Sequence, residues 1–372
     1  MTRLGLYTVS ISLLMSASCV DRLGFEIGKI GEDAVVVEGY ITDQPGPYEI
    51  RVSQAYNIDT TVVRRIPAAA SKIYMSDNLG NTEELKKIRE GVYQTDVNGI
   101  QGVIGRAYKL RVEFPDGRVY ETPFDTIRPT GIVQNINHQL VKSTDRNGVP
   151  GYAFDVYFDA KAGETSNRRF LWKTSMTYKV QTNPEDHTVD CGRTKCQDPL
   201  DCSGYIVNPN GGGLLWVKPC TCCFCWISIN PDVPVVSDDI VDGNTFSHLK
   251  AGQVPVTGLT MSYKTRVEIR QFSLSETAYS FWKAFRAQKD GIASLFQPAS
   301  GKVVGNWTQV QGTTSPLFGV FYASSVTKNA VDLDIGDLPD ASMVPSIGTY
   351  FPYSCLDFDY STNVQPDFWD VE

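Results

Sequence analysis

Apolar and polar residues alternate along many short segments of this chain, and this pattern limits the folds open to it. Residues 48–52 carry an apolar side chain at every second position, and residues 108–114 repeat the pattern. A period of two places alternate side chains on one face of a β-strand. Pro115-Asp116-Gly117 follows the second segment as a chain reversal. The aromatic content of 11% and the 31 glycines also favour strands joined by many turns. We therefore predict a mainly β protein.

The alternation divides the chain into two β-rich parts. Residues 33–127 are predicted to form an antiparallel β-sandwich, immunoglobulin-like or transthyretin-like. Residues 128–372 are predicted to form a larger β-rich domain, in which the alternation resumes from Tyr152 onward. One segment, 275–289, has the apolar stripe of an amphipathic helix. The sequence from Ser273 to Glu276 matches a capping box ahead of this helix, and Gly291 is placed to end it.

The N-terminus has the pattern of an export signal. Residues 1–18 contain an apolar run after Arg3 and end in small residues directly before Cys19. This arrangement is typical of a bacterial lipoprotein signal, in which Cys19 becomes the lipidated first residue and residues 19–32 form a tether. A lipid anchor, at ~0.8 kcal/mol per buried CH₂, holds a protein on a bilayer without a spanning helix. The alternative is an ordinary signal peptide cut near Ala17, which leaves Cys19 as a plain thiol.

Eight further cysteines lie downstream, and seven of them fall in a Cys-rich insertion at 191–225. The disulfide candidates are Cys191, Cys196, Cys202, Cys220, Cys222, Cys223, Cys225 and Cys355. A thiolate metal site is one interpretation of the CxCCxC run. Disulfides are favoured, because the chain is exported and lacks two separated CxxC pairs. We expect the 191–202 group to pair with the 220–225 group, and one cysteine to reach Cys355. The exact connectivity stays open.

Several kinds of chemistry find no support in the sequence. The net charge of −8 and the pI of 5.1 argue against a nucleic-acid partner. The three histidines form no HExxH, and neither a GxSxG elbow nor a P-loop is present. We predict no catalytic residues, no cofactor and no metal site. The remaining candidates for acid–base chemistry are Asp357 and Asp359, which would share one face of an expected strand.

A set of segments spread over nearly the whole chain is similar to a known family. They are 36–48 (VVEGYITDQPGPY), 281–288 (beginning Phe-Trp-Lys), 296–306, 318–324 (FGVFYAS) and 366–369 (PDFW). In this order they resemble the DUF4249 family of Bacteroidota lipoproteins. The resemblance implies an envelope lipoprotein, often encoded beside TonB-dependent outer-membrane transporters. It supplies no catalytic residues.

Together these features predict a non-enzymatic outer-membrane lipoprotein that partners a TonB-dependent transporter. A structural or adhesive surface module is the first alternative, and an uncharacterised hydrolase using Asp357 and Asp359 is the second. The sequence leaves open which face of the outer membrane carries the protein, because only Asp21 supplies acidic character directly after Cys19. It does not identify a ligand.

Overall fold

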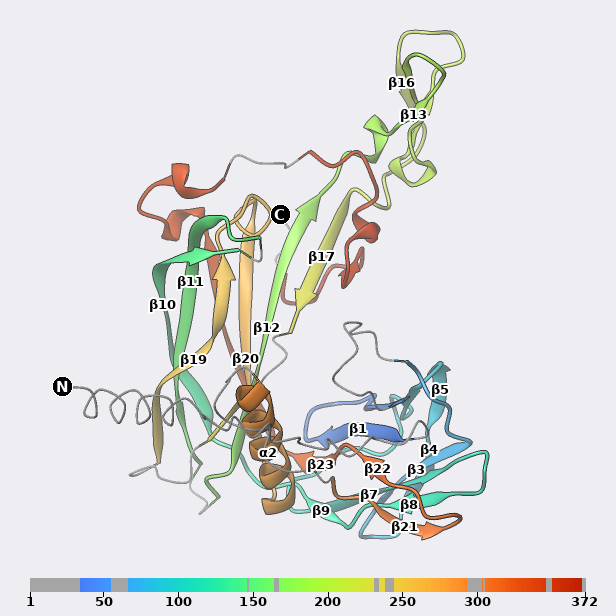
Figure 1. The fold of residues 1–372 in the computed structure, drawn as a ribbon, viewed down its shortest axis with the longest axis vertical. Helices are drawn as coiled ribbons and strands as arrows, with labels where there is room; N and C mark the ends of the chain where they lie inside the picture. The colour runs from blue at the N-terminus through green and yellow to red at the C-terminus, as the bar shows by residue number, and fades with distance from the viewer. Residues whose placement is uncertain are drawn as a thin grey trace, which may run out of the picture.

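The fold of this chain is seen in a computed structural model. It describes residues 34–54, 66–145, 147–163, 167–230, 234–237, 244–292, 303, 305–345 and 350–369. The protein is mainly β, as predicted, with two β units and one α-helix among these residues (Figure 1). None of the helices in this part of the chain is both long and apolar enough to span a bilayer.

The N-terminal unit is a sandwich of two six-stranded sheets. The first sheet contains β1 (Val35–Thr42), β2 (Glu49–Gln54), β5 (Lys86–Arg89), β6 (Val92–Gln94), β22 (Leu317–Phe318) and β23 (Phe321–Ser324). The second contains β3 (Lys72–Asp77), β4 (Thr82–Glu84), β7 (Ala107–Glu113), β8 (Val119–Glu121), β9 (Asp125–Thr126) and β21 (Thr308–Gln311). Alternate side chains such as Ile50, Ile73 and Leu110 are fully buried between the sheets. The sandwich predicted from these alternations is therefore present.

Strands from late in the chain complete this sandwich. β22 and β23 pair in parallel with β1, and β21 pairs antiparallel with β8. Phe321 and Ala323 of β23 belong to the sandwich core. Gly319, between β22 and β23, has φ +89°, and a Cβ there would lie 2.3 Å from the Val37 carbonyl oxygen, so only glycine fits. The predicted division at residue 127 assigned all of 308–324 to the second part, whereas these strands lie in the first.

The second unit contains a three-stranded and a six-stranded sheet. The three-stranded sheet consists of β10 (Ile132–Thr144), β11 (Pro150–Lys161) and β19 (Thr245–Pro255). The other consists of β24 (Val326–Asp334), β20 (Lys264–Ser273), β12 (Phe170–Gln181), β17 (Phe224–Ile229), β25 (Ser361–Thr362) and β18 (Val235–Val236). One core cluster joins Phe154 and Phe158 of the first sheet to Trp172 and Ile269 of the second. The buried Trp172 indole donates to Gln271 Oε1 at 2.8 Å, which satisfies its polar atom.

Helix α2 (Glu276–Ile292) corresponds to the helix predicted at 275–289. Its cap differs from the prediction. The Ser275 hydroxyl accepts from the Ala278 amide at 3.4 Å, whereas the Ser273 hydroxyl donates to the Arg128 carbonyl instead. The predicted Ser273–Glu276 capping box is therefore wrong, because the Ser273 hydroxyl is engaged by Arg128 and does not cap the helix. Ala278, Phe281 and their neighbours pack α2 against both units.

Five short 3₁₀ helices complete the described elements. They are η1 (Pro184–Asp186), η2 (Asp201–Ser203), η3 (Ile335–Asp337), η4 (Ala341–Met343) and η5 (Cys355–Asp357). The first two lie in the excursion that connects β12 to β17, and this excursion carries the candidate site.

Candidate functional site: a disulfide-stapled arm

Residues 183–223, here called the arm, leave the six-stranded sheet between β12 and β17. Figure 1 shows the arm projecting beyond the strands of the second unit. It contains two small hairpins, β13 (Thr188–Asp190) with β14 (Lys195–Gln197), and β15 (Tyr205–Val207) with β16 (Leu214–Trp216). Isolated two-stranded hairpins are marginally stable in water. The arm therefore needs other constraints to hold a defined shape.

Disulfides supply these constraints. Three bonds lie within the arm, Cys191–Cys196, Cys202–Cys222 and Cys220–Cys223, and a fourth, Cys225–Cys355, joins β17 to η5. All eight predicted cysteines are thus paired. Two of the expected pairings hold, namely one bond between the two groups and one bond to Cys355. The expectation that the 191–202 group as a whole pairs with the 220–225 group is wrong. Cys191–Cys196 and Cys220–Cys223 close inside their own groups, because short turns bring those residues together.

Backbone contacts hold the base of the arm in place. The Thr221 amide donates to the Cys202 carbonyl at 2.8 Å, and the Thr182 hydroxyl donates to the Cys222 carbonyl at 3.0 Å. His187 Nδ1 lies 2.8 Å from the Asp198 carbonyl oxygen, which links the two sides of the first hairpin. Hydrogen bonds from Thr182, directly after β12, therefore fix the base of the arm, and its disulfides brace it internally.

The second hairpin and the residue that follows it, 205–217, present apolar side chains to solvent; we call this segment the apolar hairpin. The exposed fractions are Ile206 44%, Val207 49%, Leu215 46%, Trp216 58% and Val217 47%. Ile206 faces Leu215 across the hairpin, and Tyr205 faces Trp216 on the opposite side. No charged residue occurs between Asp201 and Lys218. Exposed apolar patches of this kind mark interaction sites.

The sequence contained a signal for this surface that our prediction did not use. Leu214-Leu215-Trp216-Val217 is an apolar run inside a sixteen-residue stretch without charge. An apolar run predicts burial as readily as exposure. Only the projection of the arm shows that these side chains face solvent.

The other sequence-predicted residues do not form a second site. Asp357 ends η5, Asp359 follows it, and both are exposed, so the expectation that they share a strand face is wrong. His138 contacts Asp337, and His248 stacks on Tyr157, far along the chain from His187. Within the described ranges, no group of His, Cys, Asp and Glu could hold a metal ion. Cys19 lies outside the described residues.

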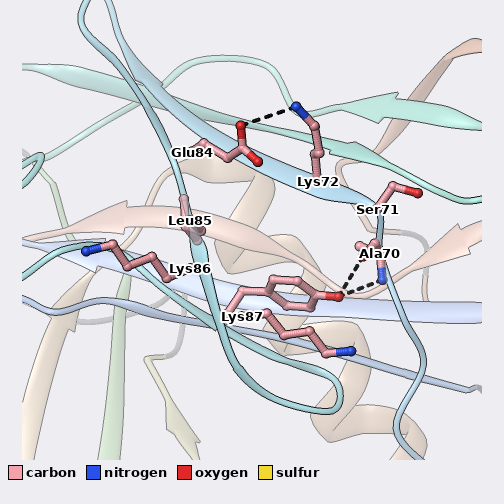
Figure 2. A pocket seen from close by; sticks show the side chains of 8 residues that line it. Ala70, Ser71, Lys72, Glu84, Leu85, Lys86 and Lys87 are labelled. Carbon is pink, nitrogen blue, oxygen red and sulfur yellow. Dashed lines mark hydrogen bonds and ion pairs between the residues drawn. The ribbon is translucent and has the colours of Figure 1, made fainter.

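Two open hollows lie on the N-terminal sandwich. The first, of about 460 Å³, has Tyr93 in its lining together with Lys72, Glu84, Lys86 and Lys87, which Figure 2 shows. Lys72 pairs with Glu84 at 3.4 Å, and the Tyr93 hydroxyl donates to the Ala70 carbonyl at 2.8 Å. A second hollow of about 620 Å³ shares Glu84 and Lys86 with the first.

The charges in these hollows are already matched by neighbours. The hydrogen bond between Lys86 and Asp96 raises the pKa of Lys86 and lowers the pKa of Asp96. Lys87 pairs in the same way with Glu90 at 2.6 Å. The lysine and glutamate side chains that line the first hollow are roughly half exposed, so it offers little enclosed surface to a ligand. The arm is the stronger candidate.

The fold and the arm define a class: a mainly β, disulfide-bonded protein with a projecting apolar hairpin. A family model described as "Domain of unknown function (DUF4249)" matches residues 20–330, and the chain belongs to this family. The match includes the arm and the strands that complete the sandwich, and ends before Cys355. No curated protein matches the chain. No solved structure matches it either.

Proposed function

We propose that this protein is a non-catalytic, lipid-anchored lipoprotein of the outer membrane that serves as an accessory partner of a TonB-dependent transporter. The lipoprotein-type signal ending at Cys19 supports the anchor. The four disulfides are in keeping with an oxidising compartment outside the cytoplasm. The resemblance to DUF4249 proteins, which are often encoded beside such transporters, supports the choice of partner. The apolar hairpin is the contact surface in this proposal.

The exposed apolar side chains of the hairpin carry this proposal. Fully burying one Val, Leu or Ile side chain is worth roughly 1.5–3 kcal/mol. Trp216 is the most exposed member at 58%, and tryptophan is enriched among residues that dominate binding energy. The uncharged stretch from Cys202 to Val217 avoids the desolvation of charges when a partner covers it. The disulfides hold the hairpin in advance, which lowers the entropy lost on binding.

The test is capture of the transporter by the full-length protein with its lipid anchor intact. Wild-type protein is extracted from membranes in mild detergent and purified, and co-purifying outer-membrane barrels are identified and quantified. The Leu215→Asp/Trp216→Ser variant is expected to retain the anchor and lose at least about 90% of the captured barrel, since a new charge would need to be buried.

Val149→Asp is the matched control. Val149 is 57% exposed, nearly the same fraction as Trp216 at 58%, but it lies in the β10–β11 turn, outside the arm. This variant should capture the barrel as wild type does. The proposal is wrong if wild type captures no barrel, or if the hairpin variant captures as much as the control.

A further inference from the structure

One lysine lies among aromatic rings where the two units and helix α2 meet. The Lys173 ammonium, on β12, is 4.6 Å from the centre of the Tyr40 ring on β1. It is 5.1 Å from Phe272 on β20, 5.2 Å from Trp282 on α2 and 5.6 Å from Tyr322 on β23. We call these five residues the Lys173 junction. Because β1 and β23 belong to the sandwich, the junction joins it to the second unit.

The hydrogen-bonding groups around Lys173 include several donors. Among the described residues, the buried Tyr322 hydroxyl and Trp282 Nε1 have no hydrogen-bond partner, and Arg270 Nε forms an ion pair with Glu268 Oε1 at 3.5 Å. Burial raises the pKa of Tyr322 well above its ordinary value, so the hydroxyl keeps its proton. An ammonium adds three donors and no acceptor, whereas a neutral amine offers a lone pair that can accept. The excess of hydrogen-bond donors around the amine therefore favours a neutral Lys173.

The neighbouring charges favour the same form. Arg270 is the cross-strand partner of Lys173 on β20, and Arg51 lies on β2. Glu38 on β1 acts the other way, because its charge raises the pKa of Lys173. Lys173 keeps some contact with solvent, but burial, followed by Arg270, lowers its pKa to about 7. Attraction to the four rings acts in the opposite direction and favours the charged form, whereas the loss of hydration favours the neutral amine.

We propose that Lys173 is a protonation switch at this junction: neutral Lys173 keeps the sandwich, α2 and the second unit packed together, and protonated Lys173 loosens their contact. The proposal goes beyond the function proposed above and does not depend on it. The apolar hairpin lies in the arm, separate from this junction.

The pH range follows from the two states of the junction. When the junction loosens, the amine regains water and its ordinary pKa of 10.5. Between pH 10.5 and about 7 the loosened state therefore binds more protons than the packed state. Packing is strongest at the alkaline end, weakens roughly tenfold per pH unit as the pH falls, and changes little below pH 7.

Hydrogen exchange of the full chain at pH 9 and pH 7, corrected for intrinsic exchange rates, tests the proposal. In wild type, the opening equilibrium of α2 and β23 should rise at least tenfold at pH 7. Lys173→Met should abolish this response, because methionine fills the same space without a proton to bind. Lys173→Arg should be open at both pH values, because arginine stays charged.

Lys328→Met is the control. Lys328, on β24, is the cross-strand partner of Arg270 and lies on the same side of the sheet as Lys173. Its side chain is 65% exposed. It should respond to pH as wild type does. The proposal is overturned if Lys173→Met keeps the wild-type pH response.

A measurement on wild type keeps the proposal testable if the variants fail to fold. Competitive acetylation over pH 5–11, read by mass spectrometry, gives the titration midpoint of each lysine amine. A Lys173 midpoint near pH 7 supports the proposal, and a midpoint near 10.5 overturns it.

Discussion

Asp125 is a single residue that ties three parts of the fold together. Its carboxylate accepts from the Ala323 amide at 3.1 Å, the Ser275 hydroxyl at 3.0 Å and the Arg128 guanidinium at 3.2 Å. Asp125 lies on β9, Ala323 on β23, and Ser275 caps α2. The residue is only 6% exposed. A buried carboxylate with three donors is costly to remove, because each donor then loses its acceptor.

We predict that Asp125→Ala lowers the free energy of unfolding by about 2–4 kcal/mol, since three hydrogen bonds to a charged acceptor are lost together. Denaturant unfolding followed by circular dichroism measures the change. Glu90→Ala removes an exposed carboxylate that pairs with Lys87. It should cost far less than Asp125→Ala, because exposed ion pairs contribute little to stability. Equal losses in the two variants would contradict the role given to Asp125.

Among the elements, the disulfides differ most in what they connect. Cys225–Cys355 joins β17 to η5 across a sequence separation of 130, whereas Cys191–Cys196 spans only 5. Both cysteines of the longer link are fully buried beside Val180 and Ile227. The longer link therefore constrains the unfolded chain much more strongly.

We predict that Cys225→Ala/Cys355→Ala lowers the free energy of unfolding by about 3–5 kcal/mol, from the larger loop released in the unfolded state. The Cys191–Cys196 bond closes only a small loop, so Cys191→Ala/Cys196→Ala should cost at most about 2 kcal/mol. Thermal unfolding of both double variants under oxidising conditions gives the comparison. A larger loss from the Cys191–Cys196 pair would rule out loop length as the main cause.

The sequence predicted the individual secondary-structure elements better than the pairings and contacts between distant parts of the chain. Alternation located the strands around Ile50, Leu110 and Tyr152, because side-chain period is a local property. Cysteine count predicted that all eight would be bonded, but pairing depends on the turn that brings Cys220 to Cys223. The apolar hairpin was missed because Trp216 carries no local sign of whether it is buried. The Lys173 junction was missed because its residues come from β1, β12, β20, β23 and α2.

At the scale of the whole molecule, the sandwich is not a self-contained segment of the chain. β1 pairs with β2 on one edge and with β22 and β23 on the other. Without residues 305–325, that edge of β1 and the outer edge of β8 lose their partners. Core contacts of Phe321 and Ala323 are lost at the same time. Unpaired edges of this kind promote aggregation.

We predict that residues 33–127 expressed alone are insoluble or lack a cooperative unfolding transition. A single chain that appends residues 303–326 through a flexible linker should regain soluble, cooperative folding, because β21, β22 and β23 are restored. Solubility and thermal unfolding by circular dichroism distinguish the two. A well-folded 33–127 fragment would show that the late strands are dispensable.

The return of β22 and β23 to β1 has a consequence for how the protein acquires its structure. The first strand of the sandwich leaves the ribosome long before the strands that complete its edge. Contacts so distant in sequence make folding slow, because the chain closes a very large loop to form them. Until residue 324 is available, the apolar strand Val35–Thr42 stays exposed on one edge. Folding of the sandwich therefore waits until nearly the whole chain has been made.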